Sequence, residues 1–228
     1  MKHASFLLPY LFLATLAAAQ TTTPAAIPIT AEPSHHVILE NEYVRVLKIE
    51  VAPHAQMQVH RHDHDYAFIT FGEAEIENTV TGKDPVKVEL HDGEVRFRMG
   101  GFSHTARNLS DHPLRNIAVE FLRDSTHAPA TDYAPSPSPS QKILFIQDGV
   151  RVSEIRLAAG ASLPRHTHKG PHLVIAISDI DLRSDADARP PREVHQKSED
   201  AVWVPGGFTH TLTNIGTAEA HFIALEFE

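Results

Sequence analysis

Two stretches of the chain repeat one another at a constant offset of 106 residues, and most of the residues that they share are potential metal ligands. His60-Arg61-His62 returns as His166-Thr167-His168, and the run from Gly100 to His104 returns from Gly206 to His210. The match needs no gap between residues 37 and 122. A repeat of this length indicates a duplicated domain rather than a solenoid.

The duplication divides the 228 residues into two units, each long enough to bury a core of its own. We expect a first domain over residues 36–122 and a second over residues 141–228. Residues 123–140 are rich in Pro and Ser and predict a linker between them. Residues 20–35, rich in Thr, Pro and Ala, predict a flexible entry segment with little to bury.

The beginning of the chain has the pattern of a secretory signal peptide. Lys2 and His3 precede an apolar run over residues 6–16, and Ala17-Ala18-Ala19 provides a small-residue cleavage site. The alternative is a membrane anchor, but the run is shorter than the ~20 residues that a spanning helix needs. We therefore expect a signal peptide over residues 1–19, cleaved after Ala19, and a mature protein in the periplasm or secreted.

Composition restricts the chemistry and the partners. The chain has no Cys, which excludes disulfides and thiolate ligands, so any metal must be held by nitrogen and oxygen donors. The net charge is −9 without a basic patch, so neither nucleic acid nor an anionic membrane is an expected partner. A nucleophilic triad is not recognisable either, and catalytic residues remain unassigned at this stage.

The periodicity within each copy is that of β-strands. Branched and aromatic residues fill or alternate along residues 66–71, 86–90 and 173–177, and turn residues such as those of 81–85 separate the strands. Apart from the leader, no long stretch has the apolar period of a helix. Many short strands with evenly spaced turns predict an all-β sandwich or barrel.

The shared histidines have the spacing of a metal site. Residues i and i+2 of a strand point to the same face, so His60 and His62 can bind one ion, as can His166 and His168. A further histidine follows a Gly-Gly turn 42 residues later in both copies. Three imidazoles leave coordination positions open, as in a reactive site. The expected ligands are His60, His62 and His104 in the first copy and His166, His168 and His210 in the second.

These motifs resemble those of the cupin superfamily, whose first motif reads G-x5-H-x-H-x3,4-E-x6-G and whose second reads G-x5-P-x-G-x2-H-x3-N. The second copy has Gly160, His166 and His168 of the first motif, and Pro205, Gly207, His210 and Asn214 of the second. The first copy matches with His60, His62, Gly93, His104 and Asn108. The resemblance spans nearly the whole mature chain and implies a bicupin: two tandem jelly-roll β-barrels, each with one divalent ion held by the motif histidines.

Both copies depart from the family at its Glu ligand. The residue at this position in the second copy is His172, which could complete a four-His site or could cap the turn after Gly170-Pro171. In the first copy the position is held by Tyr66, after His64 and Asp65. Asp65 could replace the Glu after a one-residue slip, His64 could continue the face of His60 and His62, and Tyr66 could be a neighbour of the ion or simple barrel filling.

By resemblance the chain is expected to be a metal-dependent oxidoreductase of the dioxygenase type. Fe(II) is the favoured ion, with Mn, Ni, Cu and Zn as alternatives, and the partner would be a small chelating organic substrate. The alternatives are a non-catalytic protein that binds metal or a small ligand, and a metal-dependent lyase or isomerase. Monomer and homodimer are both compatible with the sequence. Five further histidines lack a recognisable spacing and are expected at the surface: His35, His36, His54, His112 and His221.

Overall fold

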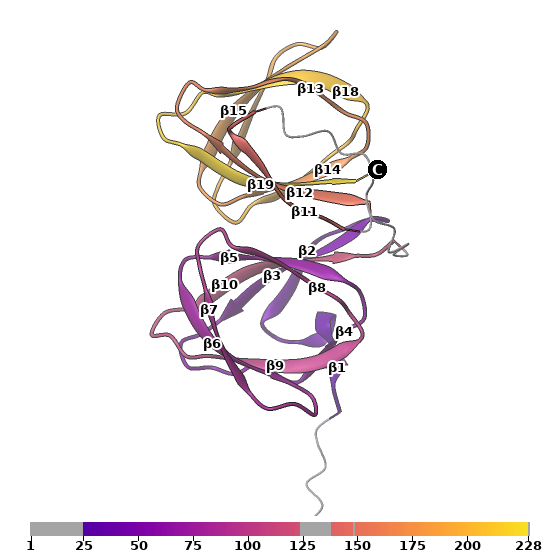
Figure 1. The fold of residues 1–228 in the computed structure, drawn as a ribbon, viewed down its shortest axis with the longest axis vertical. Coiled ribbons are helices and arrows are strands. Elements are labelled where there is room, and N and C mark those ends of the chain that lie inside the picture. Colours follow the sequence, from indigo (N-terminus) through magenta and orange to yellow (C-terminus); the bar gives the residue numbers. More distant parts are fainter. Residues whose placement is uncertain (1–24, 124–137, 148, 228) are drawn as a thin grey trace, which may run out of the picture.

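The structure is a computed structural model that describes residues 25–123, 138–147 and 149–227. It consists of two β-barrels stacked one above the other along the long axis of the molecule, with a sheet of each barrel facing the other (Figure 1). The expected signal peptide and residues 124–137 of the expected linker lie outside the described residues. Within the described ranges, no helix has the length and apolar content to cross a membrane.

Domain 1 is built from two five-stranded sheets. The first, which we call site sheet 1, contains in spatial order β1 (Ile27–Pro28), β4 (His60–His62), β9 (Phe102–Asn108), β6 (Ala74–Val80) and β7 (Val86–Leu90). The second, interface sheet 1, contains β2 (His35–Glu40), β3 (Val44–Val51), β10 (Leu114–Phe121), β5 (Tyr66–Phe71) and β8 (Val95–Arg98). A short 3-10 helix, η1 (Ile29–Ala31), connects β1 to β2.

Domain 2 repeats this arrangement without a counterpart of β1 among its described strands. Interface sheet 2 contains β11 (Gln141–Gln147), β12 (Val150–Leu157), β19 (Ala220–Phe227), β14 (His172–Ala176) and β17 (Ala201–Val204). Site sheet 2 contains β13 (Ser162–His168), β18 (Phe208–Asn214), β15 (Ile180–Ala186) and β16 (Arg192–Gln196). The prediction of an all-β fold of two tandem jelly-roll barrels is confirmed.

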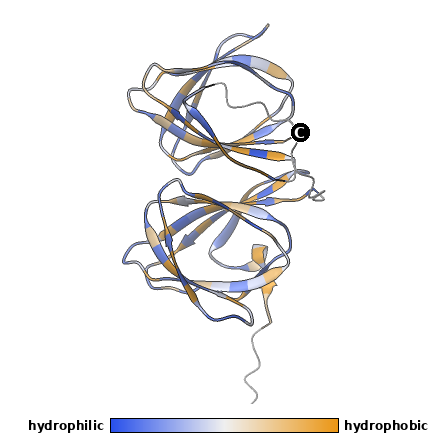
Figure 2. Ribbon diagram, in the orientation of Figure 1, coloured by the Kyte–Doolittle hydropathy of each residue, from blue (hydrophilic) through white to orange (hydrophobic). Residues whose placement is uncertain are grey.

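The strands alternate between two environments, as the period of two requires. Along β19, Ile223, Leu225 and Phe227 belong to an apolar core between the domains, whereas Phe222 and Glu226 line the cavity of domain 2. Figure 2 shows polar and apolar positions interleaved along the strands of both barrels. The core between the domains joins residues of both interface sheets, so each barrel covers an apolar face of the other. Each barrel also has a core of its own.

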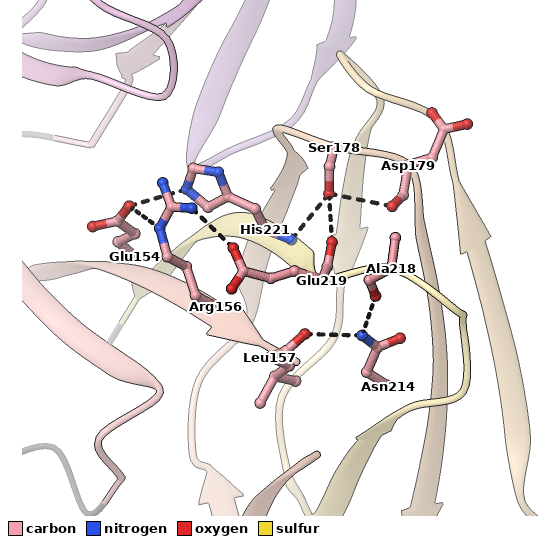
Figure 3. A network of polar contacts seen from close by, with 9 residues as sticks. All are labelled: Glu154, Arg156, Leu157, Ser178, Asp179, Asn214, Ala218, Glu219 and His221. Atoms are coloured by element: carbon pink, nitrogen blue, oxygen red, sulfur yellow. Dashed lines mark hydrogen bonds and ion pairs between the residues drawn. The ribbon is translucent and has the colours of Figure 1, made fainter. Parts of the chain in front are cut away.

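A buried asparagine anchors the turn that leads into the last strand of each barrel. The Nδ2 of Asn214 donates hydrogen bonds to the carbonyl oxygens of Leu157 and Ala218 at 2.9 and 2.8 Å (Figure 3). In domain 1, the Nδ2 of Asn108 donates hydrogen bonds to the carbonyl oxygens of Val51 and His112. These bonds satisfy backbone groups inside the barrel, which explains why an Asn follows each third histidine at the same distance.

The prediction of a flexible segment over residues 20–35 is wrong for its described part. Ile27 pairs in parallel with His60, so β1 extends the edge of site sheet 1. Ile29 is buried in the core of domain 1. The apolar side chains at positions 27 and 29 stabilise the segment despite the surrounding Thr, Pro and Ala. His35, expected at the surface, is buried as well.

Candidate metal centres

Strand pairing brings the three repeated histidines of each copy together. His60 and His62 point to the same face of β4, and β9 pairs with β4 so that His104 lies directly opposite His60. In domain 2, His210 of β18 lies opposite His166 of β13 in the same register. The three histidines of each copy offer nitrogen atoms within 4.8 Å of one another. We call these sets triad 1 and triad 2.

The Gly-Gly turn before the third histidine allows a close approach of two backbone segments. A Cβ on Gly206 would lie 2.2 Å from the carbonyl oxygen of Gly170, and one on Gly100 would lie 2.5 Å from that of His64. The next glycine, Gly207, has a φ of +81°, in the left-handed region. Its N–H donates to the carbonyl oxygen of His168 at 2.8 Å, which ties the start of β18 to the end of β13.

The hydrogen bonds of triad 2 indicate a cation site. The three Nε2 atoms lie 3.0–3.1 Å from one another. His166 donates its Nδ1 proton to the carbonyl oxygen of Pro164, and His168 donates its own to Glu226. The Nδ1 of His210 lies 2.7 Å from the hydroxyl of Ser184. With protons on Nδ1, the three Nε2 lone pairs converge on one point, which suits a divalent ion.

Triad 1 repeats this arrangement with different partners. The Nδ1 of His60 donates to the carbonyl oxygen of Gln58 at 2.9 Å, and that of His104 lies 2.6 Å from the Oδ1 of Asn78. The Nε2 atoms of His62 and His104 are 3.0 Å apart. Both the Nδ1 of His62 and the Nε2 of His60 are buried without a protein hydrogen-bond partner. An ion would give the Nε2 of His60 a partner, so these residues fit a divalent metal too.

Burial favours the neutral form, which binds metal, in His60, His62, His104, His166 and His210. Burial lowers the pKa of His62 to about 2 and the pKa values of His104 and His210 to about 3. It also lowers the pKa values of His60 and His166. Their neighbouring histidines add to the effect in His62, His104 and His210, because positive charges at such short range repel.

His172 and Tyr66 occupy equivalent positions beside the triads and not within them. The ring of His172 stacks on His168 with centroids 4.0 Å apart, and that of Tyr66 stacks on His62 at 4.1 Å. Both side chains are buried, and burial lowers the pKa of His172 to about 3. Among the His, Cys, Asp and Glu side chains of the described residues, the donor atoms within 4.8 Å of one another do not include those of His172. The position of the expected fourth ligand is therefore occupied by a flat ring against the second histidine.

His64 and Asp65 lie at the turn and outside triad 1. Asp65 accepts a hydrogen bond from the N–H of Gly100 at 2.7 Å, so its carboxylate holds the Gly-Gly turn in place. The backbone of His64 is the surface against which Gly100 packs. Neither side chain is among the clustered donors of the described residues.

The sequence reasoning missed two glutamates in the barrels. Glu226 accepts from His168 Nδ1 at 2.9 Å and also binds Arg151. Burial acts against its charge, but the hydrogen bond from His168 and the charge of Arg151 hold the pKa of Glu226 at about 2. Its counterpart Glu120 binds Arg45, and burial raises its pKa. The signal was present in the repeat, which matches both the arginines and the glutamates at the same offset.

Each triad borders a cavity inside its barrel. The cavity of domain 2 has a volume of about 780 Å³ and is lined by triad 2 and by apolar side chains such as Val174, Leu182, Phe208 and Phe222. The cavity of domain 1 has a volume of about 340 Å³ and is lined by His62, His104, Tyr66 and Phe102, among others. Domain 2 therefore has room for a small organic molecule next to the metal ligands.

Comparison with solved structures identifies the fold. The chain is similar to a cupin 2 conserved barrel domain protein from Leptotrichia buccalis, with a TM-score of 0.54, 15% identity and coverage of 85% of this chain and 88% of that one. An oxalate decarboxylase from Bacillus subtilis has a TM-score of 0.60, 12% identity and coverage of 85% and 72%. A salicylate 1,2-dioxygenase from Pseudaminobacter salicylatoxidans has a TM-score of 0.56, 13% identity and coverage of 82% and 71%.

No protein-family model and no curated protein sequence matches the chain. The structural similarity nevertheless extends over both barrels, because it covers most of this chain. The protein therefore has the cupin fold, in tandem, as the motif resemblance implies.

Proposed function

We propose that this protein is a metal-dependent oxidoreductase of the dioxygenase type that acts on a small chelating organic substrate in domain 2. The observation that carries the proposal is the convergence of three Nε2 atoms, 3.0–3.1 Å apart, at the wall of a cavity of about 780 Å³. Three imidazoles would hold a divalent ion and would leave coordination positions for substrate and O2. Fe(II) is the ion that we favour.

The residues around the ion would have separate roles. A bound redox-active ion would supply the activation of substrate toward O2. His166, His168 and His210 would hold the ion, and Glu226 would fix the orientation and proton position of His168. The apolar walls of the cavity would exclude water from the reaction. One of the similar structures is a salicylate 1,2-dioxygenase, so the fold accommodates chemistry of this type.

The rim of each cavity favours a negatively charged substrate. Lys83 and Arg189 occupy the same position of the repeat, between β6 and β7 and between β15 and β16. Both side chains are exposed and line their cavities. Arg189 lies over the ring of Phe208, which packs against His210. A cation so placed would attract the phenolate, enolate or carboxylate group with which a chelating substrate binds a metal.

Metal content tests the two triads separately. We expect two equivalents of divalent metal per chain in the wild type and the loss of one in each of the variants His60→Ala and His166→Ala. The exposed His195 provides a matched control, because its imidazole pairs with Asp181 and belongs to neither group of clustered donors, so His195→Ala should leave the content unchanged. Retention of both equivalents in a triad variant would contradict the ligand assignment.

Oxygen consumption tests the chemistry. Fe(II)-loaded protein should take up O2 with at least one member of a panel of chelating phenols and β-diketones, and His166→Ala should abolish the uptake. Stoichiometric metal without uptake across the panel would instead support a non-catalytic binding protein or non-oxidative metal chemistry. The signal peptide that we expect over residues 1–19 would place this activity in the periplasm or outside the cell.

A further inference from the structure

The two domains have the same kind of side chain at the position where the cupin motif has its Glu. His172 of β14 and Tyr66 of β5 occupy this position of the repeat. Each is a flat ring that stacks on the second histidine of its triad. The exposed fractions of the two residues are only 5% and 6%, yet each lines the cavity of its barrel. His172 is not among the clustered donors, so its position beside the triad needs another explanation.

The polar atoms of both rings have no hydrogen-bond partner among the described residues. The Nδ1 of His172 is buried and unpartnered. Its Nε2 is unpartnered too but is not one of the buried atoms, so Nε2 is the nitrogen that reaches the cavity. By the same reasoning the hydroxyl of Tyr66 reaches the cavity of domain 1. Polar groups of residues buried to this degree are normally hydrogen-bonded, so we expect each to bind a molecule inside the cavity.

Both polar groups are hydrogen-bond donors. A neutral imidazole has one N–H and one lone pair. Proteins bury an N–H without an acceptor more rarely than an acceptor without a donor, so we assign the lone pair of His172 to Nδ1 and its proton to Nε2. Burial raises the pKa of Tyr66, which keeps its hydroxyl protonated. Each cavity therefore has one donor next to the triad.

These donors suit a molecule that binds the ion through oxygen. His172 contacts His168 and Tyr66 contacts His62, so a molecule bound to the ion would lie beside the donor. A phenolate, enolate or carboxylate oxygen can bind a divalent ion with one lone pair and accept a hydrogen bond with another. A ligand that binds through a neutral aromatic nitrogen has no second lone pair to offer.

We propose that His172, and Tyr66 at the same position of domain 1, donates a hydrogen bond to an anionic oxygen of the organic molecule bound at the ion. The proposal rests on the metal binding proposed above and adds the residue that orients the substrate. It also explains why the carboxylate of the motif is missing: a negative charge at this position would repel an anionic substrate, whereas a neutral donor attracts it.

The test uses the full chain with triad 1 inactivated by His60→Ala and with Co(II) bound, because the visible absorption of Co(II) reports ligand exchange. Two probes are titrated: 4-nitrocatechol, which binds through oxygen, and pyridine, which binds through nitrogen. His172→Phe retains a flat ring and removes both nitrogens. It should weaken 4-nitrocatechol binding by roughly 10–100-fold, the contribution of one hydrogen bond to a charged group, and should leave the affinities for pyridine and Co(II) unchanged. His195→Phe, at an exposed ring that does not line the cavity, should change none of the three.

Tyr66→Phe is the matched test in domain 1, since it removes a single hydroxyl. It is measured with the same probes in a protein that has His166→Ala, and the same selective loss of 4-nitrocatechol affinity is expected. Circular dichroism checks the fold of the metal-free variants. If His172→Phe does not fold, Tyr66→Phe decides.

The outcomes separate this proposal from the proposed function. Unchanged 4-nitrocatechol affinity in a folded variant would overturn the donor role and leave the triad as a metal site. An equal loss for both probes would overturn it too, because a change in cavity shape does not distinguish oxygen from nitrogen. Weaker Co(II) binding by His172→Phe would make His172 a metal ligand instead. No Co(II) binding by the background proteins would overturn the proposed function together with this proposal.

Discussion

Glu120 and Glu226 occupy the same position of the repeat but have different partners in the two domains. Glu226 binds both Arg151 and the Nδ1 of His168, whereas Glu120 binds Arg45 and has an Oε1 without a partner. In domain 1 the Nδ1 of His62 is also without a partner. A carboxylate that orients a metal-bound histidine raises its basicity and restricts its rotation. This support exists in domain 2 and not in domain 1.

The exchange Glu226→Gln should weaken metal binding in domain 2 by about 10–100-fold, because it removes the charged acceptor behind His168. The affinity can be measured by competition with a coloured chelator in a protein that has His60→Ala, so that only triad 2 reports. Glu120→Gln, measured at triad 1 in a protein that has His166→Ala, is the matched control, since it disrupts an equivalent ion pair with arginine but no contact with a triad histidine. An equal loss of affinity at the two triads would contradict this role for Glu226.

At the scale of the elements, the Gly-Gly turn positions the third histidine of each triad. Its two glycines are required for different reasons. Gly206 packs against backbone, so any side chain would displace the end of β13 from the start of β18. Gly207 faces open space, and its only requirement is the left-handed backbone conformation.

Alanine should therefore be more harmful at the first glycine than at the second. Gly207→Ala should lower the free energy of unfolding by roughly 1–2 kcal/mol, the cost of a left-handed residue with a Cβ. Gly206→Ala should cost more than about 3 kcal/mol, because the backbone must move, and should also reduce the metal content of domain 2. Urea denaturation of the two variants gives the comparison. A larger cost at Gly207 would refute this explanation of the turn.

The sequence predicted the elements and the triads because both follow from local rules. The period of two and the turn residues located strands such as β5 and β7, and the i, i+2 rule placed His60 beside His62. The repeat identified His104 and His210 as the third ligands, and this prediction did not require the strand order. The burial of His35 beside His60 could not be predicted in this way, because the barrel brings His35 to triad 1 from another sheet. The stacking of His172 on His168 also depends on the direction of a side chain, which spacing alone does not determine.

At the scale of the molecule, His221 links the barrels. Its Nε2 lies 3.0 Å from the Oε1 of Glu154, and Arg156 bridges Glu154 and Glu219 beside it (Figure 3). A Cβ on Gly93 of domain 1 would lie only 2.8 Å from the ring of His221. Burial lowers the pKa of His221, assisted by Arg156 and opposed by Glu154 and Asp92. The ring is therefore held neutral where the domains meet.

Acid should weaken this contact. The folded pKa of His221 lies below its ordinary value of 6.5, so between these two values the unfolded chain binds more protons than the folded one. The contribution of His221 is present above 6.5 and is lost as the pH falls toward the folded pKa. His221→Gln should make the free energy of unfolding of the metal-free protein less sensitive to pH between about 7 and 5, the range in which histidine titrates. Urea denaturation across this range is the measurement, and His36→Gln is the control. An unchanged pH dependence in His221→Gln would contradict the assignment.

The β-bulge near the start of each interface sheet indicates which features are older than the duplication. Both β2 and β11 shift register at the same place, after Val37 and after Ile143. A shared irregularity of this kind is inherited more simply than it is acquired twice, so the single ancestral barrel already contained it. The pairs Tyr66 and His172, and His35 and Gln141, differ between the halves and diverged after the duplication. The surroundings of the two triads thus changed after the duplication, while both halves kept the bulge.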